Sequence, residues 1–378
     1  MKWCTVIKQI SFSTWAVRIA LIGMATGALY AFLSWNMVVA DEQDNLITIY
    51  AYSDMLASED FDDFTAETGI EVRVRHFEAI EEVTTKLVFT HDGGIDIVAP
   101  TDAMVEILVQ KQLLRPLDAK RLPSIAELNP ALLGRFYDPQ NVYTYPFSWS
   151  PVGIGYDTRV VQTPREEIGW DLIWGRPDKK GIRSPAQLYG KGVDKVCLGE
   201  DPFELFFLIL IHLYGAVDAE ITPTRQRRIE SYLKRQKAWV ECYTNNLRYF
   251  LASGVSPAVV IPGAYMIQCM HEYPWADFVV PSVGSIMYVG NLGIPVSSKK
   301  IDTAHRVIEY LLSQKGARAV YDAHAFIPAN TKACDELPPE VLKHPHLYPR
   351  DVNKRNIMTS HNLIPLQQME DMWHAIIV

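Results

Sequence analysis

The chain has 378 residues, more than one compact hydrophobic core normally serves, so we expect it to fold as two lobes. Hydrophobic residues make up 48% and charged residues 21%, which is typical of a globular protein and excludes a disordered or fibrous chain. The formal net charge is −8, so the basic character of a nucleic-acid-binding protein is absent. An acidic balance is compatible with a cationic ligand but does not establish one.

The first 40 residues (1–40) have the pattern of a secretory signal peptide. Three basic residues and no acidic residue accompany an apolar run over 19–35, and small residues end at Ala40. We therefore predict cleavage after Ala40 and residence in the periplasm. The apolar run is about as long as a short membrane span, so an uncleaved anchor in the inner membrane is the alternative. Cleavage would leave 33 Lys and Arg against 44 Asp and Glu, a net charge of −11.

Strands and helices alternate in the segment that follows, which predicts an α/β sheet. The hydrophobic pattern predicts strands over 46–52, 72–76 and 95–99, and helices over 58–67, 80–89 and 101–112. In such sheets ligands bind beyond the carboxyl ends of the strands. Two of these ends carry polar side chains, at Tyr52-Ser53-Asp54-Met55 and at Pro100-Thr101-Asp102-Ala103.

The second part of the chain continues the same alternation. An apolar, aromatic and glycine-bearing segment, 145–157, is a candidate for a strand that crosses between two lobes. After it the pattern predicts helices over 168–174, 202–214, 225–239 and 303–312, and strands over 193–198, 258–261 and 285–294. The polar stretch 176–192 is expected to be an exposed insertion. The helix over 225–239 is basic, and its charge is most simply a solvated face.

Four cysteines follow the signal peptide and could pair in an oxidising compartment. Four cysteines allow three pairings, and the sequence alone cannot choose between them. Cys197 and Cys242 both end strand-like segments, which favours a Cys197–Cys242 disulfide; four buried free thiols are the alternative. No Cys or His spacing predicts a metal site, and no cofactor is expected.

The tetrad Asp201-Pro202-Phe203-Glu204 has two interpretations. Asp at the N-cap, Pro at the first helical position and Glu three residues after the Asp are typical of a capping box, which alone could account for both carboxylates. The alternative is that both acids lie in a ligand site. A helix N-terminus favours anions, so the pair would stay ionised there and would suit an ammonium ligand.

Four further residues could belong to the same site. Asp54 and Asp102 follow two other strand ends, and each could instead be a simple helix cap. Tyr52 and Tyr288 could contact a cation through their ring faces, an interaction worth about 0.5–2 kcal/mol per ring. Alternatively, both rings simply pack in the core.

Several long stretches resemble the spermidine/putrescine-binding periplasmic proteins, the polyamine-binding components of bacterial ABC importers in solute-binding protein family 1. LITIYAYSDMLASEDFDDFTAETGIEV and DIVAPTDAMVEILVQKQLLRPLD resemble the first lobe of that family. LNPALLGRFYDPQNVYTYPFSWSPVGIGYD resembles its crossover, and NLGIPVSSKK, AHRVIEYLLS, FIPAN and LYP continue the match. The resemblance implies a type II periplasmic-binding-protein fold, with two α/β lobes joined by a hinge and a ligand cleft between them. By position, lobe 1 comprises 41–150 and 289–336, and lobe 2 comprises 151–288 and 337–378.

The family's ligand-binding residues carry over only in part. The matching positions are Tyr52, Ser53 and Asp54 in the first loop, Thr101 in the second, and the acid pair Asp201 and Glu204. The family's Phe-Trp-Met-Asp motif appears as Met287-Tyr288-Val289-Gly290. In the family that aspartate pairs with a ligand ammonium, which Gly290 cannot do.

We therefore expect a periplasmic substrate-binding protein, without catalytic residues, that captures a polyamine and delivers it to an inner-membrane ABC permease as a monomer. Asp201 and Glu204 would hold one ammonium, and Tyr52 and Tyr288 would line the methylene chain. Ser53, Asp54, Thr101 and Asp102 would supply polar contacts from lobe 1. A different small cationic or amino-acid-like ligand, which Gly290 favours, and a membrane-anchored sensor or interaction subunit are the alternatives. No nucleophile elbow, phosphate loop or metal spacing points to an enzyme.

Overall fold

The structure, a computed structural model, describes residues 45–77, 80–89, 94–179, 181–215, 221–349, 357–359, 369 and 371–374. The predicted signal peptide or anchor, 1–40, lies outside the described residues. Within these ranges, every helix falls short of the length and hydrophobicity that a bilayer crossing requires.

A mixed sheet of 12 strands runs through the described part of the chain. Its main path has the order β2-β1-β3-β12-β5-β10-β8-β9, and β4, β11, β13 and β14 pair beside this path. The strands are β1 (Leu46–Tyr52), β2 (Glu71–Phe77), β3 (Ile97–Ala99), β4 (Leu114–Arg115), β5 (Thr144–Asp157), β8 (Val196–Leu198), β9 (Val240–Tyr243), β10 (Ala258–Pro262), β11 (Ala276–Val279), β12 (Ser285–Pro295), β13 (Ile327–Pro328) and β14 (Ile357–Thr359). A separate hairpin pairs β6 (Arg176–Asp178) with β7 (Gly181–Arg183).

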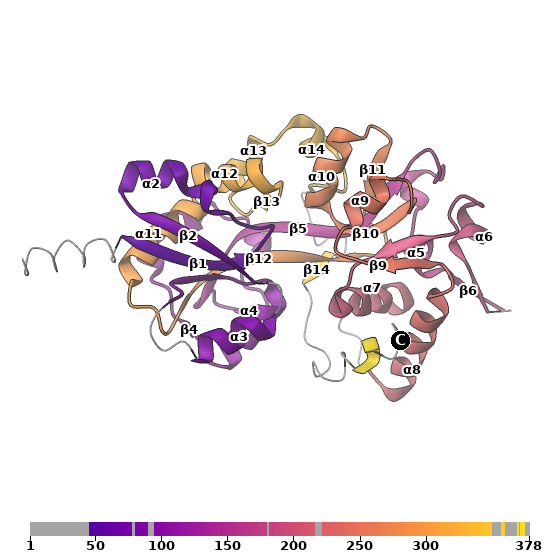
Figure 1. The fold of residues 1–378 in the computed structure, drawn as a ribbon, viewed down its shortest axis with the longest axis horizontal. Helices are drawn as coiled ribbons and strands as arrows, with labels where there is room; N and C mark the ends of the chain where they lie inside the picture. Colours follow the sequence, from indigo (N-terminus) through magenta and orange to yellow (C-terminus); the bar gives the residue numbers. More distant parts are fainter. Residues whose placement is uncertain are drawn as a thin grey trace, which may run out of the picture.

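Helices flank the sheet (Figure 1). The α-helices are α2 (Asp62–Thr68), α3 (Ile80–Phe89), α4 (Asp102–Gln110), α5 (Asp171–Trp174), α6 (Pro185–Tyr189), α7 (Pro202–Tyr214), α8 (Pro223–Gln236), α9 (Leu247–Ala252), α10 (Gly263–Glu272), α11 (Ile301–Leu312), α12 (Gln314–His324), α13 (Thr331–Asp335) and α14 (Pro339–Lys343). The 3-10 helices are η1 (Ser58–Phe61), η2 (Ala119–Arg121), η3 (Pro123–Glu127), η4 (Pro130–Leu132) and η5 (Arg165–Glu167).

Two long strands join the two halves of the molecule. Figure 1 shows β1, β2, α2 to α4 and α11 on the left, β9, β10 and α5 to α9 on the right, and β5 and β12 running between them. The first part of β5 pairs antiparallel with β12, from Thr144↔Gly293 to Pro151↔Met287. The second part pairs antiparallel with β10, from Val152↔Pro262 to Tyr156↔Ala258. The prediction of a strand over 145–157 is therefore confirmed, and Figure 1 shows this strand running from one half to the other.

Side chains of the same strand serve two cores, because successive residues of a strand point to opposite faces. In β10, Val259 and Ile261 belong to a large cluster that reaches into the left half. Ala258 and Val260 belong to a second cluster, which contains most of the apolar side chains of α7. The α/β sheet predicted from the alternating pattern is confirmed, and both of its faces are covered.

Several predicted helices differ in extent from the observed ones. The helix predicted over 58–67 is the 3-10 helix η1 followed by α2, which ends at Gly69 in the left-handed conformation (φ 69°), as the glycine predicted. The helix predicted over 168–174 is wrong in its first part, because only α5 is α-helical. The helix predicted over 225–239 begins earlier, because Thr222 accepts a hydrogen bond from the Arg225 N–H and caps α8. The stretch 176–192, expected to be an exposed insertion, contains the β6–β7 hairpin and α6.

Candidate functional site

The N-terminus of α7 carries the acid pair singled out in the sequence. Strand β8 ends at Leu198, and Asp201 then caps the helix by accepting hydrogen bonds from the backbone N–H groups of Phe203 (2.8 Å) and Glu204 (3.4 Å). Pro202 occupies the first helical position, where its missing N–H has no cost. The capping interpretation is thus correct for Asp201.

Glu204 does not close a capping box but reaches the crossing strand β12. Its Oε2 accepts a hydrogen bond of 2.7 Å from the Tyr288 hydroxyl, although the two residues lie 84 positions apart. The Glu204 residue is only 5% exposed, while Asp201 is exposed. Asp201, Glu204 and Tyr288, three of the predicted site residues, therefore form one cluster.

The surrounding protein raises the pKa values of the two carboxyl groups in this cluster and so disfavours their ionised forms. Burial raises the pKa of Glu204 to about 8, and the charge of Asp201 acts in the same direction, while the hydrogen bond from Tyr288 opposes both. Desolvation also raises the pKa of Asp201, in spite of its exposure, and the two backbone N–H groups counteract this effect. Burial and the neighbouring carboxylates raise the pKa of Tyr288, which keeps its hydroxyl a donor. Without a cation the cluster holds a carboxyl group that is largely neutral at pH 7.

The carboxyl end of β1 supplies the first predicted loop of the left half. The Tyr52 ring is half-buried and packs on Phe77 with a centroid distance of 4.3 Å. Ser53 and Asp54 lie in the following turn, and both are exposed. Strands β1 and β3 are parallel neighbours, with Ala51 opposite Ala99, so this turn and the start of α4 lie at the same edge of the sheet.

The second predicted loop reaches β12 beside Tyr288. Thr101 forms an isolated antiparallel bridge with Gly290, two residues beyond Tyr288 on the same strand. Side chains two residues apart in a strand point to the same face, so the loop lies beside the Tyr288 cluster. Asp102 is buried (1% exposed), and its negative charge contributes to the raised pKa of Tyr288. The structure thus brings the loops of the left half and the acids of α7 to the same part of β12.

The position of Gly290 is enclosed by side chains that the sequence did not single out. A Cβ at Gly290 would lie 2.4 Å from Met55 Cε, 2.7 Å from Ser148 Oγ and 2.9 Å from Phe147 Cε1. Met55, Phe147 and Ser148 are all buried. The aspartate that the family motif would place here requires neighbouring side chains to move, because the terminal methyl group of Met55 occupies the space beside the new Cβ. The sequence shows a methionine at 55 and a glycine at 290, but nothing in it predicts that the two residues are in contact.

The predicted cysteine pair is also brought together. Cys197 and Cys242 are register partners on the parallel strands β8 and β9, and their Sγ atoms lie 3.3 Å apart as free thiols. Burial raises the pKa of the Cys197 thiol to about 12. The described residues contain no cluster of three or more His, Cys, Asp or Glu side chains that could hold a metal ion.

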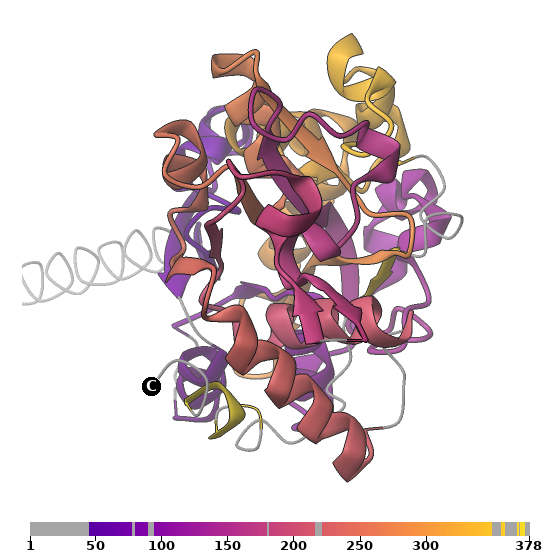
Figure 2. The same cartoon turned by 90° about the vertical axis from the view of Figure 1, so that its right-hand side faces the viewer.

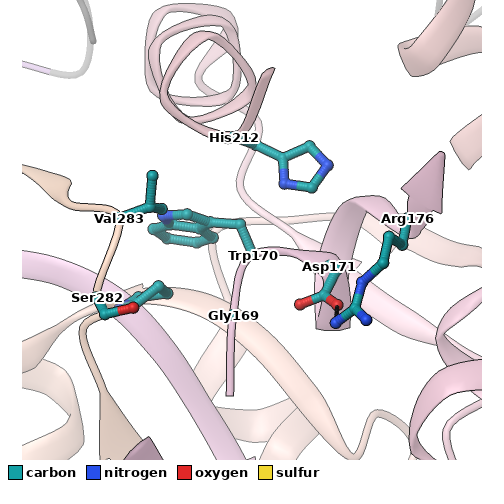
Figure 3. A pocket seen from close by; sticks show the side chains of 8 residues that line it. Gly169, Trp170, Asp171, Arg176, His212, Ser282 and Val283 are labelled. Atoms are coloured by element: carbon teal, nitrogen blue, oxygen red, sulfur yellow. Dashed lines mark hydrogen bonds and ion pairs between the residues drawn. The ribbon is translucent and has the colours of Figure 1, made fainter. Parts of the chain in front are cut away.

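A separate cavity of about 240 Å³ lies in the right half, at the other end of α7. His212 lines this cavity and follows Glu204 by eight positions in α7, which corresponds to a rise of about 12 Å along the helix. Figure 3 shows the His212 ring above Trp170 and the ion pair of Asp171 with Arg176. Burial lowers the pKa of His212 to about 4, so the ring is neutral at pH 7. None of the predicted site residues lines this cavity.

The amino-acid sequence is similar to those of a known protein family. Residues 61–349 match the family of bacterial extracellular solute-binding proteins. The chain is 26% identical over 308 residues to a spermidine/putrescine-binding periplasmic protein of Haemophilus influenzae, covering 81% of both chains. It is 26% identical over 328 residues to the spermidine/putrescine-binding periplasmic protein of Escherichia coli, covering 86% of this chain and 88% of that protein.

The fold agrees with that of a solved structure. The spermidine/putrescine ABC transporter substrate-binding protein of Streptococcus pneumoniae superposes with a TM-score of 0.73 at 22% sequence identity, over 88% of this chain and 98% of that one. At this identity the superposition shows the fold, which is that of the periplasmic binding proteins. Together with the match over 61–349, it shows that the chain belongs to the family of bacterial extracellular solute-binding proteins.

Proposed function

We propose that this protein captures a polyamine of the putrescine/spermidine class and delivers it to an ABC permease of the inner membrane. The observation that carries the proposal is the cluster of Asp201, Glu204 and Tyr288. It holds the buried carboxyl group of Glu204, whose pKa burial raises, beside the exposed carboxyl group of Asp201, and no Lys, Arg or His of the described residues forms an ion pair with either. A bound ammonium group would stabilise the ionised carboxylates, because an opposite charge within a few ångströms favours the ionised form. The names of the relatives, which refer to spermidine and putrescine, support this ligand class.

In the proposed complex, Asp201 and Glu204 hold one ammonium group, and Tyr288 lines the methylene chain beside them. Tyr52 lines the chain from the left half. Ser53, Asp54, Thr101 and Asp102 supply polar contacts there. Support comes from the Thr101–Gly290 bridge, which joins the two sets of residues at β12. No covalent chemistry is needed for this task, so we propose no catalytic residue.

We also propose two lobes, with lobe 1 formed by 41–150 and 289–336 and lobe 2 formed by 151–288 and 337–378. The crossing of β5 and β12 between the halves supports these bounds. A contact near the C-terminus supports the assignment of that segment to lobe 2, because His344 bonds Asp277 of β11 at 3.1 Å. The ligand would lie between the lobes, and β5 and β12 would act as the hinge.

Delivery to a permease requires residence outside the cytoplasm. We propose that the basic and apolar segment at 1–40 exports the chain to the periplasm, and that the protein works there as a monomer. The names of the relatives as periplasmic proteins support this location. Sequencing the N-terminus of the exported protein distinguishes cleavage after Ala40 from an uncleaved anchor.

Isothermal titration calorimetry of ligand-stripped protein with putrescine, spermidine and spermine tests the function. We expect saturable binding of at least one of them. Glu204→Gln should weaken that binding more than about tenfold, because hydrogen bonds to charged groups contribute about 1.5–3 kcal/mol. Glu241→Gln is the matched control, since Glu241 is an exposed residue paired with Lys195 and should leave the affinity unchanged. Absence of heat with all three amines would disprove the polyamine assignment.

A second candidate ligand, a small cation with only one ammonium group, is favoured by one observation. Met55 fills the space beside Gly290, so the left side of the site lacks the carboxylate that the family motif supplies. A thermal-shift screen of single amines and amino acids distinguishes the two classes. Ligand at 100 times its dissociation constant stabilises the folded state by about 2.7 kcal/mol.

A further inference from the structure

A strongly basic face lies away from the ligand site, on the outer side of the right half. Residues 176–183 and 223–237 contain ten Lys or Arg and only two acidic residues, in a chain whose net charge is −8. We call this surface the outer basic face and define it by Arg227, Arg228, Lys234 and Arg235 of α8 with Arg176 and Arg183 of the β6–β7 hairpin. All six residues are exposed.

The periodicity of α8 concentrates its charge on one side. Its buried residues, Ile229, Tyr232, Leu233 and Gln236, follow helical spacing and pack into the second core cluster or beside it. The four exposed cations lie on the opposite side as two pairs seven residues apart, and the exposed residue between the pairs is the uncharged Ser231. One acidic residue of α8, Glu230, borders this stripe; it is half-buried and accepts a hydrogen bond of 3.0 Å from Gln226.

The four exposed cations of α8, Arg227, Arg228, Lys234 and Arg235, have no ionic partner among the residues that the structure describes. Arg227 donates to the Thr224 hydroxyl, and Arg228 lies over the Tyr214 ring at 5.6 Å from its centroid. Elsewhere on the surface many Lys and Arg are paired, for example Arg121 with Asp302 and Lys315 with Glu67. An unneutralised row of this kind produces a local positive potential on an acidic protein.

The β6–β7 hairpin extends the same face. A Cβ at Gly181, in β7, would lie 3.7 Å from a guanidinium nitrogen of Arg235. Figure 2 faces this side of the molecule and shows α8 running across the front with the hairpin beside it. Glu204 belongs to the first turn of α7, whereas the outer basic face belongs to α8 and the β6–β7 hairpin, so the outer basic face and the ligand site are separate features.

We infer that the outer basic face binds the surface of a membrane that contains anionic phospholipids. Clusters of four to eight Lys or Arg on a helix are typical of surfaces that associate with acidic lipid headgroups. Of the face's residues only Arg176, which pairs with Asp171, lines the cavity of the right half; the four α8 cations are long, exposed and spread along the helix, outside that cavity. Such a surface suits a fluid array of headgroups, because the lipids can rearrange to meet it.

The same structure limits the association to the membrane surface. The apolar side of α8 is already buried in the protein core, so this helix cannot insert its apolar face into the acyl region as an interfacial amphipathic helix does. Binding should therefore be electrostatic, reversible and sensitive to salt, since a Debye length of about 8 Å at 0.15 M shortens further as salt is added. On the proposed function, such binding would concentrate the loaded protein near the permease.

Co-sedimentation with vesicles tests the inference, using the exported protein with its native N-terminus. The probes are vesicles of phosphatidylcholine alone and vesicles that also contain the anionic lipid phosphatidylglycerol. The patch variant is Arg227→Glu/Arg228→Glu/Lys234→Glu/Arg235→Glu. The matched control, Lys111→Glu/Lys120→Glu/Lys299→Glu/Arg306→Glu, makes the same charge change at exposed positions of the left half.

We expect the wild type and the control to bind the anionic vesicles and to release them at high salt. Each cation near such a surface strengthens association roughly fivefold, so the patch variant should lose at least about tenfold in partition coefficient. Replacing Arg227, Arg228 and Arg235 by Lys should retain binding, and polyamine titration of the patch variant should be unchanged. Equal binding of both vesicle types, or equal binding of patch variant and control, overturns the inference. Binding to an acidic polypeptide but not to anionic vesicles also overturns it, in favour of a protein partner.

Discussion

Glu204 combines burial with a hydrogen bond from Tyr288, and this combination decides how the site responds to a cation. A carboxyl group with a pKa of about 8 is mostly protonated at pH 6 and mostly ionised at pH 9. An ammonium ligand binds the ionised form, so it must displace the proton of Glu204 at neutral pH. At the proposed site, ligand binding and proton release would therefore be coupled.

This coupling predicts that polyamine affinity rises with pH between 6 and 8.5. The ligand's ammonium groups stay charged in this range, as their pKa resembles the value of about 10.4 for lysine. Up to one proton should be released per ligand at pH 6 to 7, which calorimetry in buffers of different ionisation enthalpy measures. Glu204→Gln should remove both the pH dependence and the proton release. An affinity that stays constant from pH 6 to 8.5 contradicts the assignment of Glu204.

The sign for stability is the opposite of that for affinity. The folded ligand-free protein holds the Glu204 proton with a pKa of about 8, whereas an unfolded glutamate has a pKa of about 4.3. The stabilisation from this proton is fully present below the unfolded value and is lost as the pH rises through about 8. Glu204→Gln should flatten the fall in unfolding free energy over that range, as measured by urea denaturation.

Gly290 offers a test of packing at the same site. Gly290→Ala should destabilise the protein by about 1–3 kcal/mol, because the new methyl group overlaps Met55, Ser148 and Phe147. Met55→Ala should relieve part of this overlap, so the double variant should lose less than the sum of the two single variants by about 1 kcal/mol or more. Urea denaturation of the four proteins gives the coupling. Gly263→Ala is the control, because its Cβ would meet Phe278 only at 3.4 Å and should be nearly neutral.

Some residues of the candidate site could be predicted from the sequence, whereas their contacts could not. The acid pair could be predicted because it follows a strand and begins a helix. Tyr288 could be predicted because it lies in a segment that matches a family motif. The contact of Glu204 with Tyr288 and the filling of Gly290 by Met55 were not predictable, because they depend on side chains 84 and 235 positions apart. No spacing rule reports such long-range packing.

At the scale of elements, the pairing of β8 with β9 brings two thiols into contact. In an oxidising compartment we expect Cys197 and Cys242 to form a disulfide, because they are register partners with Sγ atoms 3.3 Å apart. The bond should stabilise the protein by about 2–4 kcal/mol, a typical value for a loop of this length. Urea denaturation with and without reductant measures this contribution. Cys242→Ser should abolish the effect of the reductant, whereas Cys334→Ser should preserve it. Four titratable thiols in the exported, unfolded protein would contradict the bond.

Elements with strong local signals were predicted well, and those stabilised by tertiary contacts were not. Helix α7 has an Asp cap, a Pro at its first position and a Gly215 stop, and it was predicted with its observed bounds. The segment 176–192 lacks an apolar period, because the short β6–β7 hairpin and α6 pack only part of their residues inward. Helix α5 is held in place by tertiary contacts, such as the hydrogen bond of 2.7 Å from the Tyr189 hydroxyl to Asp171, which no periodicity could reveal.

At the scale of the whole molecule, the alternation of strands and helices predicted the α/β class, and the long strand β5 predicted a connection between two parts. The strand order β3-β12-β5-β10 could not be predicted from the sequence. Strand β12 lies between β3 and β5, which precede it in the chain by more than 120 residues. This insertion places Tyr288 and Gly290 between the acids of α7 and the loops of the left half. The site is therefore a product of topology as much as of residue type.

A ligand that binds at this meeting point should contact both halves, and that requirement gives a test of the whole arrangement. Asp54→Asn removes a charge from the exposed turn after β1, and Glu204→Gln removes one from α7, in the other half. If the ligand bridges the halves, each change should weaken polyamine binding by calorimetry, and ligand should reduce the radius of gyration of the wild type in solution scattering. Asp194→Asn, an exposed change in the right half, should affect neither quantity. Loss of binding with Glu204→Gln alone, together with an unchanged radius of gyration, would show that the ligand is held by one half and that β5 and β12 do not act as a hinge.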